Sequence, residues 1–221
     1  MNNIHCHKDA PESHPFLFRN ANLPLFKEID THLLCDAKPS QYLRCLHGST
    51  FEKTYPFTML SRLISTRQSP RHHPEGNVWN HTLMVVDEAA VRKDEAIAGS
   101  RVFMWAALLH DIGKGTTTKI RNGKITAYDH DKAGGVMSRE FLREFEEEPF
   151  VSKVAALVRW HMQILYATKN MRFADFNAMK SETDVRDVAL LGLCDRLGRL
   201  GVDKYKEEKA VQDFLRMTGS K

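Results

Sequence analysis

The sequence has few of the features that mark secreted, membrane-spanning or disulfide-stabilised proteins. Its four cysteines, Cys6, Cys35, Cys45 and Cys194, are scattered and form no Cys-x-x-Cys pair. This usage predicts reduced thiols in a cytoplasmic protein rather than a disulfide framework. The longest apolar run, around residues 103–109, is far too short to span a bilayer. No charged-then-apolar stretch opens the chain as a secretory signal would, so we expect no membrane partner.

Neither sign of charge dominates the composition. Lys and Arg number 32 against 28 Asp and Glu, which leaves a formal net charge of +4 over 221 residues. This balance allows an anionic small-molecule substrate but gives only weak support to RNA as a partner. The length fits one domain, or one domain with an extension, and no internal repeat is present.

Hydrophobic periodicity and helix-ending residues predict a nearly all-α fold with one small β-hairpin near residues 116–128. The hairpin is indicated by Asn122-Gly123 between two β-branched runs. We interpret 1–66 as an N-terminal extension, a loose arm followed by short helices that pack on the core, and 67–221 as the main domain. The expected helices cover 22–35, 39–48, 58–66, 77–98, 101–111, 131–147, 150–165, 173–180, 184–201 and 203–217, with Ser100 as an N-cap.

Histidine is the residue type that stands out, with eleven in the chain. His5 and His7 flank Cys6 in the arm, but no partner cluster follows them, so we assign no metal there. His81, His110 and His161 lie on apolar faces of three different predicted helices, and Asp195 lies on that of a fourth.

A lone histidine on an apolar face is usually a hydrogen-bonded core residue. Asp195 is harder to explain in this way, because an unpaired buried carboxylate costs several kcal/mol. Convergence of the four helices on one or more cations removes that cost. Asp111 adjoins His110 where its helix ends near Gly113, so it can reach the same cleft. Imidazole and carboxylate ligands without sulfur favour one or two divalent ions among Mn, Fe, Co, Ni, Zn or Mg over Ca or a cysteine-type zinc site.

These residues resemble a known signature. His81, His110-Asp111 and Asp195 are similar to the motif of the HD-domain metal-dependent phosphohydrolases, and the resemblance is strongest to the C-terminal HD domain of bacterial tRNA nucleotidyltransferases, the CCA-adding enzymes. It extends over roughly residues 70–202 and implies an all-α HD-domain helical bundle. The segments that carry it are 73–85, 106–116, 129–130, 160–161 and 194–199.

The sequence departs from those enzymes upstream of this region. No glycine-rich strand-turn followed by Asp-x-Asp occurs there, and about 70 residues could not hold a nucleotidyltransferase head. We therefore expect a free-standing HD hydrolase that does not add nucleotides to tRNA.

The resemblance also implies a role for each ligand. His81, His110, Asp111 and Asp195 would bind a first metal ion. Asp111 would bridge to a second ion, which His130 and His161 would also hold.

The resemblance implies roles for four further residues, and each of these residues also has a purely structural explanation. Lys114 would face phosphate or assist a leaving oxygen, unless it is a solvated lysine at a helix end. Glu75 would touch metal-bound water or an outer histidine, unless it is a surface carboxylate. Arg196 and Arg199 would bind substrate phosphate or orient Asp195, unless they form structural salt bridges.

The leading interpretation is a metal-dependent phosphoric ester hydrolase. It would cleave a nucleotide-like phosphomonoester or cyclic phosphodiester through a metal-activated hydroxide. A di-iron oxygenase of the HD type and a non-catalytic RNA- or nucleotide-binding HD module remain alternatives.

Weaker signals surround the expected cleft. His72 and His73 lie in a proline-rich connector, where we expect exposure and no chemistry, although either could line the cleft mouth. Lys119, Arg121 and Lys124 make the hairpin basic, which fits a lid over an anion but fits a solvated hairpin better. The aromatic positions Phe141, Phe145, Phe173 and Phe176 have helical spacing and are interpreted as core.

Overall fold

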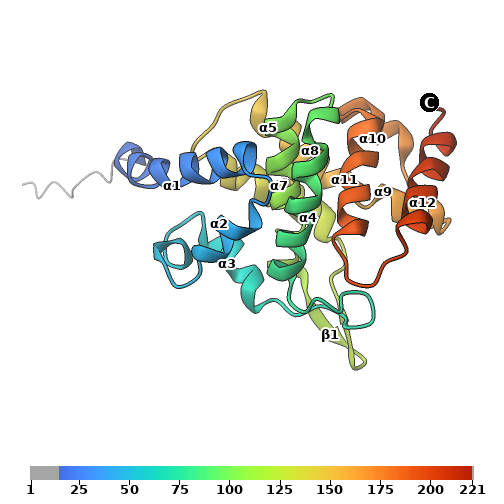
Figure 1. Cartoon of the computed structure of the whole chain (residues 1–221), viewed down its shortest axis with the longest axis horizontal. Coiled ribbons are helices and arrows are strands. Elements are labelled where there is room, and N and C mark those ends of the chain that lie inside the picture. Colours follow the sequence, from blue (N-terminus) through green and yellow to red (C-terminus); the bar gives the residue numbers. More distant parts are fainter. Residues whose placement is uncertain (1–14, 221) are drawn as a thin grey trace, which may run out of the picture.

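The protein is a bundle of helices with one projecting hairpin (Figure 1). The computed structural model describes residues 15–220, so the expected arm, with its His5, Cys6 and His7, lies largely outside the described residues. The α-helices are α1 (Pro15–Cys35), α2 (Ser40–Cys45), α3 (Thr58–Ser65), α4 (Val78–Arg92), α5 (Ser100–Leu109), α6 (Lys114–Thr117), α7 (His130–Leu142), α8 (Phe150–Trp160), α9 (Gln163–Thr168), α10 (Phe176–Glu182), α11 (Val185–Leu197) and α12 (Lys204–Met217). Two 3₁₀ turns, η1 (Thr50–Glu52) and η2 (Lys93–Glu95), complete the helical elements.

Helix α5 is the centre of the bundle. Every residue from 102 to 109 is buried, and the helix packs against α4, α8, α1 and α11. A helix that is apolar all round has no solvent face, so its neighbours must surround it. The metal-binding residues predicted at its C-terminal end are thereby placed in the middle of the molecule.

The N-terminal helix shares this core. Phe26 stacks on Trp105 of α5 with 4.6 Å between ring centroids. Asp30 accepts hydrogen bonds from Trp105 Nε1 at 2.7 Å and from Arg101 Nε at 2.9 Å. Residues of the predicted extension therefore contribute to the same hydrophobic core as the rest, and the boundary near residue 66 stays a prediction. Helix α1 begins at Pro15, earlier than the expected residue 22, and Pro24 lies inside it.

The hairpin has the predicted turn. Strand β1 (Lys119–Arg121) pairs antiparallel with β2 (Lys124–Thr126), and Asn122 and Gly123 between them have φ angles of 49° and 72°. Both angles are positive, as a two-residue hairpin turn requires. Outside this hairpin, the described residues contain no further strand, so the all-α prediction is confirmed.

Some helix ends differ from the expectation. Helix α4 ends at Arg92 rather than 98, because the carboxylate of Asp187 accepts hydrogen bonds from the backbone N–H groups of Ile97 and Ala98 and holds this segment outside the helix. Gly99 (φ 93°), not Ser100, is the N-cap of α5.

The aromatic and cysteine predictions are mostly confirmed. Phe141 and Cys194 are buried as expected, whereas Phe173 is 47% exposed and its assignment to the core was wrong. Within residues 15–220, no helix combines the length and hydropathy needed to cross a membrane.

Gly113 fixes the approach of two segments that carry candidate ligands. A Cβ at this position would lie 2.1 Å from the carbonyl oxygen of His130 and 2.6 Å from the backbone nitrogen of Gly134, both at the start of α7. Since both atoms belong to the backbone, neither can move without shifting α7. The glycine therefore allows the end of α5 to touch α7.

We predict that Gly113→Ala lowers the free energy of unfolding by about 3 kcal/mol or more, at the upper end of overpacking costs. Gly115→Ala is the matched control, because its Cβ would meet only side-chain atoms, those of the flexible Arg62 at 3.2 Å and of Leu63 at 3.6 Å. The control should change stability by less than about 1 kcal/mol, within the range of Gly-to-Ala helix propensity. Urea unfolding followed by circular dichroism measures both values, and equal midpoints for the two variants would contradict the packing argument.

Candidate metal centre

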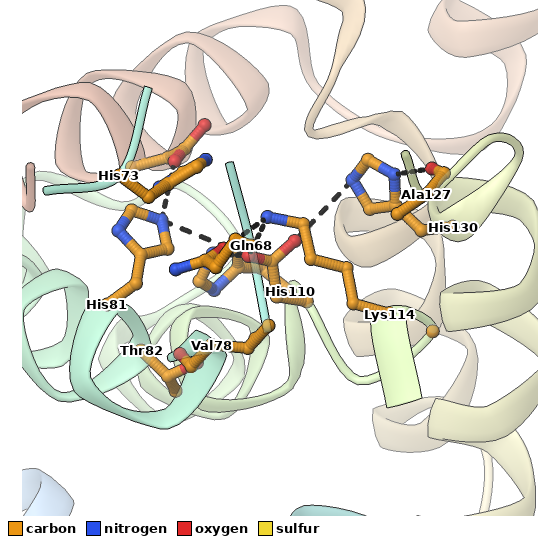
Figure 2. A network of polar contacts seen from close by, with 12 residues as sticks. Gln68, His73, Val78, His81, Thr82, His110, Lys114, Ala127 and His130 are labelled. Atoms are coloured by element: carbon orange, nitrogen blue, oxygen red, sulfur yellow. Dashed lines mark hydrogen bonds and ion pairs between the residues drawn. The ribbon is translucent and has the colours of Figure 1, made fainter. Parts of the chain in front are cut away.

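The predicted ligands meet at the base of one cavity. Figure 2 shows His81, His110 and His130 with Lys114 reaching into the space among them. The cavity has a volume of about 410 Å³, and its lining includes Asp111, His130, His161 and Asp195. His81, from the first turn of α4, and His110, which follows the last residue of α5, are fully buried, and Nε2 of each lies within 3.9 Å of Asp111.

Three of the histidines are oriented by the same local device. In each ring Nδ1 donates to the backbone carbonyl oxygen three residues earlier: His110 to Ala107 at 2.8 Å, His130 to Ala127 at 2.8 Å, and His161 to Val158 at 2.6 Å. A carbonyl oxygen can only accept, so Nδ1 carries the hydrogen and Nε2 keeps its lone pair. Metal-binding histidines are typically fixed by such a bond.

The device also explains a helix break that periodicity did not predict. His110 and His161 are the C-cap residues of α5 and α8, and His130 is the first residue of α7. The expected helix 150–165 is divided at this point into α8 and α9, although apolar residues continue through it. Helix ends thus place the rings with their Nε2 atoms toward the cavity.

Asp111 offers one oxygen to each of two histidine groups. Its Oδ2 lies 3.3 Å from Nε2 of His110 and 3.9 Å from Nε2 of His81. Its Oδ1 lies 3.5 Å from Nε2 of His130 and 3.9 Å from Nε2 of His161. The side chain is only 2% exposed. The carboxylate therefore lies between two donor groups, as the prediction of a bridging ligand requires.

His81 lies between two carboxylates. Its Nε2 is 2.9 Å from Asp195 Oδ1, and its Nδ1 is 3.0 Å from Glu75 Oε1 and 3.3 Å from the carbonyl oxygen of Gly198. Burial lowers the pKa of His81, but the hydrogen bonds with Asp195 and Glu75 outweigh burial and raise this pKa to about 9. Because both groups facing Nδ1 accept, Nδ1 carries a hydrogen, and Nε2 is the atom that would bind a metal in exchange for its proton.

Glu75 is an outer partner of the site and not a surface carboxylate. Its side chain is 2% exposed and contacts Nδ1 of both His73, at 2.8 Å, and His81. Burial would raise its pKa, but the bonds with His81, its own backbone and His73 lower it to about 2. His73, for which we expected exposure and no chemistry, belongs to this series of contacts, which runs from His73 through Glu75 to His81. Burial and the nearby charges of Lys114 and His81 lower the pKa of His73 to about 4.

Lys114 reaches the bridging carboxylate. Its Nζ is 2.7 Å from Asp111 Oδ2 and donates to Gln68 Oε1 at 3.1 Å. Burial would raise the pKa of Asp111, but the charges of Lys114 and His110 outweigh burial and keep this pKa well below its usual range. The lysine, whose side chain is 11% exposed, is thus a partner of the site and not a solvated helix-end residue. Gln68, which no sequence signal singled out, holds its ammonium group.

The two arginines line the cavity but face the same acid. Arg196 Nη1 donates to Glu207 Oε2 at 2.5 Å, and Arg199 Nη2 lies 3.9 Å from that oxygen. Both side chains line the cavity. The Arg199 charge also contributes to the pKa of Asp195, which lies well below its usual range because His81 and Arg199 outweigh the effect of burial. Arg196 is thus tied into a salt bridge, whereas Nε of Arg199 has no hydrogen-bond partner among the described residues.

A second buried ion pair supports the histidines of α7 and α8. Asp131 Oδ2 accepts from Arg159 Nη1 at 2.8 Å, and the Asp131 side chain is 2% exposed. These residues adjoin or lie close to His130 and His161, so the pair ties the two ligand-bearing helices together. Sequence reasoning missed it, because a His-Asp dipeptide is expected by chance in a chain with eleven histidines and so carries no signal of its own.

The residues fit a divalent metal. Nε2 of His110 and Nε2 of His130 are buried without a hydrogen-bond partner within residues 15–220, and an unpaired buried ring nitrogen is costly unless it binds something. Three groups of side chains have atoms close enough to hold an ion. Two of them share Asp111, which lies with His81 and His110 in one and with His130 and His161 in the other, and the third is His73 with Glu75 and His81. Burial, followed by the charges of His130 and His110, lowers the pKa of His161 to about 4, so its ring is neutral at pH 7, as a ligand must be.

Comparison with known proteins finds relatives that share about a third or more of the aligned residues with this chain. A protein of Azoarcus sp. (strain BH72) is 40% identical over 189 residues, which cover 85% of this chain and 41% of that protein. A protein of Pseudomonas fluorescens (strain SBW25) is 33% identical over 198 residues, which cover 86% of this chain and 46% of that protein. Each is named a multifunctional CCA protein, and the chain spans less than half the length of either.

The family comparison covers the ligand-bearing region. The profile of the HD domain matches residues 78–200, which is more than half of the chain. This range begins with α4 and contains all six of the predicted ligands. HD domains bind divalent metals and form a superfamily of metal-dependent phosphohydrolases, in agreement with the donor groups described above. The chain belongs to the HD domain family.

Proposed function

We infer that the protein is a divalent-metal-dependent phosphohydrolase that acts on a nucleotide-like phosphomonoester or cyclic phosphodiester. The observation that carries this inference is the placement of Asp111, which presents one oxygen to each of two histidine groups at the base of a cavity. A bound divalent ion supplies a water of lowered pKa and polarises a phosphoryl oxygen.

The cavity fits such a substrate. Its volume of about 410 Å³ is in the range of small-molecule sites. Lys114 and Arg199 provide cations for phosphate, while Ile125, Met162 and Leu165 give an apolar wall that suits a base. The multifunctional CCA proteins among the relatives support nucleotides as the substrate class.

Lys114 and Arg199 divide the phosphate contacts in this proposal. The ammonium group of Lys114 lies within 2.7 Å of Asp111 and can donate to a phosphoryl oxygen placed beside that carboxylate. Fixed donors of this kind neutralise charge that develops in the transition state. Arg199, with Nε unpartnered in the described part of the chain, orients the substrate, and Arg196 stays paired with Glu207.

Metal binding is the first test. The wild-type protein, purified without chelator and loaded with Mn²⁺, should hold two ions per chain, and Asp111→Ala should hold neither tightly because both donor groups lose their shared oxygen. His110→Ala and His161→Ala should each keep one ion. Elemental analysis and the rise in melting temperature on Mn²⁺ addition measure this. Less than one ion per wild-type chain would favour a non-catalytic module.

Hydrolysis is the second test. Mn²⁺-loaded protein should cleave a panel of phosphomonoesters and cyclic nucleotides, and Asp111→Ala should lower kcat/KM by about 10³-fold or more, which is about 4 kcal/mol of transition-state stabilisation. A metal-loaded protein that cleaves nothing on the panel contradicts the proposal. Oxygen uptake by the iron-loaded form, absent with Mn²⁺, would support an oxygenase instead.

The role of Lys114 makes a separate prediction. Lys114→Met should lower kcat by about 10–100-fold, the effect of losing one charged donor to the transition state. Lys132→Met is the matched control, because Lys132 also pairs with an aspartate three residues earlier, at 3.1 Å, but is 57% exposed. Equal kcat values for the two variants at saturating substrate would remove Lys114 from the chemistry.

A further inference from the structure

The hairpin β1–β2 carries positive charge that the metal centre does not use. It projects from the helical bundle (Figure 1). Lys119, Arg121 and Lys124 are exposed, and none of the three has an ion-pair partner within residues 15–220. A solvated hairpin does not require three cations and no anion. The arrangement of the three side chains therefore bears on whether the hairpin binds an anionic partner.

The register places the three cations on one face. Lys119 is paired with Thr126 and Arg121 with Lys124, and residues paired across an antiparallel ladder point to the same side. Arg121 Nη1 donates to Thr126 Oγ1 at 2.9 Å, which confirms that these side chains share a face. Ile120 and Ile125 point to the other side. The hairpin therefore has a basic face and an apolar face.

The hairpin that carries the basic face adjoins the cavity of the metal centre. Thr126, which shares that face, lines the cavity together with Thr118, Ile125 and Ala127. Arg67 also lines the cavity and is exposed. Positive charge is thus present both on the cavity lining, at Arg67 and Lys114, and outside it, at Lys119, Arg121 and Lys124.

An aromatic ring lies beside one of these cations. Tyr128 is 65% exposed, and the guanidinium group of Arg121 lies over its ring at 4.7 Å from the centroid. Cations interleaved with an exposed aromatic ring are typical of surfaces that bind single-stranded nucleic acid, where phosphates meet the cations and bases stack on the ring. An acidic peptide would use the cations but not the ring.

We propose that the β1–β2 hairpin is a docking surface for single-stranded nucleic acid whose terminal phosphate enters the metal centre. This inference rests on the proposed phosphohydrolase function and narrows its substrate to the end of a polynucleotide. Lys119, Arg121 and Lys124 bind the phosphates that precede the end, and Tyr128 stacks on a base.

The binding experiment uses the full chain in chelator, so that no hydrolysis occurs. A fluorescent 12-nucleotide single-stranded RNA with a 3′-phosphate is titrated at several salt concentrations. The triple variant Lys119→Ser, Arg121→Ser, Lys124→Ser should weaken binding at least 10-fold at 0.1 M salt. It should also reduce the salt slope by about 2, since each phosphate contact on a single strand contributes about 0.7. Tyr128→Ala should weaken binding about 5-fold or more.

The control removes the same charge elsewhere. Lys27→Ser, Arg44→Ser, Lys53→Ser changes three exposed cations on α1, α2 and the turn after η1, so its net charge equals that of the hairpin variant. Equal affinities for the two triple variants would overturn the proposal, as would equal competition by a poly-glutamate peptide of the same charge.

Hydrolysis separates this proposal from the one on which it rests. With Mn²⁺, the hairpin variant should keep the wild-type kcat/KM on p-nitrophenyl phosphate and lose at least 10-fold on the 3′-phosphorylated RNA. If no form cleaves p-nitrophenyl phosphate but the RNA binds through the hairpin, the phosphohydrolase assignment fails and the docking surface stands. If p-nitrophenyl phosphate is cleaved and the hairpin variant treats both substrates as wild type does, the docking surface fails alone.

Discussion

The buried carboxylate of Asp111 is the constraint on which the site depends. A carboxylate that is 2% exposed must be neutralised by nearby positive or hydrogen-bonding groups. Here Lys114 approaches one of its oxygens, and the Nε2 atoms of four histidines surround both. These side chains come from α4, the end of α5, α6, the start of α7 and the end of α8, so the requirement of one side chain determines how five segments meet.

Helix ends provide the precision that this arrangement needs. The last carbonyl oxygens of a helix have no N–H partner within that helix and can accept from a side chain. Those of Ala107 and Val158 lie in the last turns of α5 and α8, where they accept from Nδ1 of His110 and His161, three residues later. The breaks that follow these residues are therefore part of the site. Gly113 allows the same corner to lie against the backbone of α7.

The sequence predicted the features that depend on local pattern. The Asn122-Gly123 turn defined the hairpin, and polar residues on apolar helix faces indicated His81, His110, His161 and Asp195. What it could not predict depends on contacts between distant segments. Periodicity alone predicts one continuous helix over 150–165, because the residues after His161 are as apolar as those before it. The contacts of Glu75 with His73 and His81 form only when the loop before α4 packs against that helix. The Asp131–Arg159 pair forms only when α7 packs against α8.

The distribution of charge in and around the cavity affects both the approach of an anionic substrate and the entry of its phosphate. The cavity lining contains the carboxylates of Asp111 and Asp195 together with the cations of Lys114, Arg199 and the exposed Arg67, and the basic hairpin adjoins the cavity through Ile125 and Thr126. The carboxylates repel phosphate unless a cation lies on them, because two anions cannot share a low-dielectric pocket. Arg67 and the three hairpin cations, here called the rim, attract phosphate whether or not a metal ion is bound. We therefore expect the rim to govern encounter with an anionic chain, and the carboxylates with their bound metal to govern whether its terminal phosphate enters. On this view the hairpin acts when the substrate approaches and Asp111 acts when its phosphate enters. A substitution in one of them therefore leaves the role of the other unchanged.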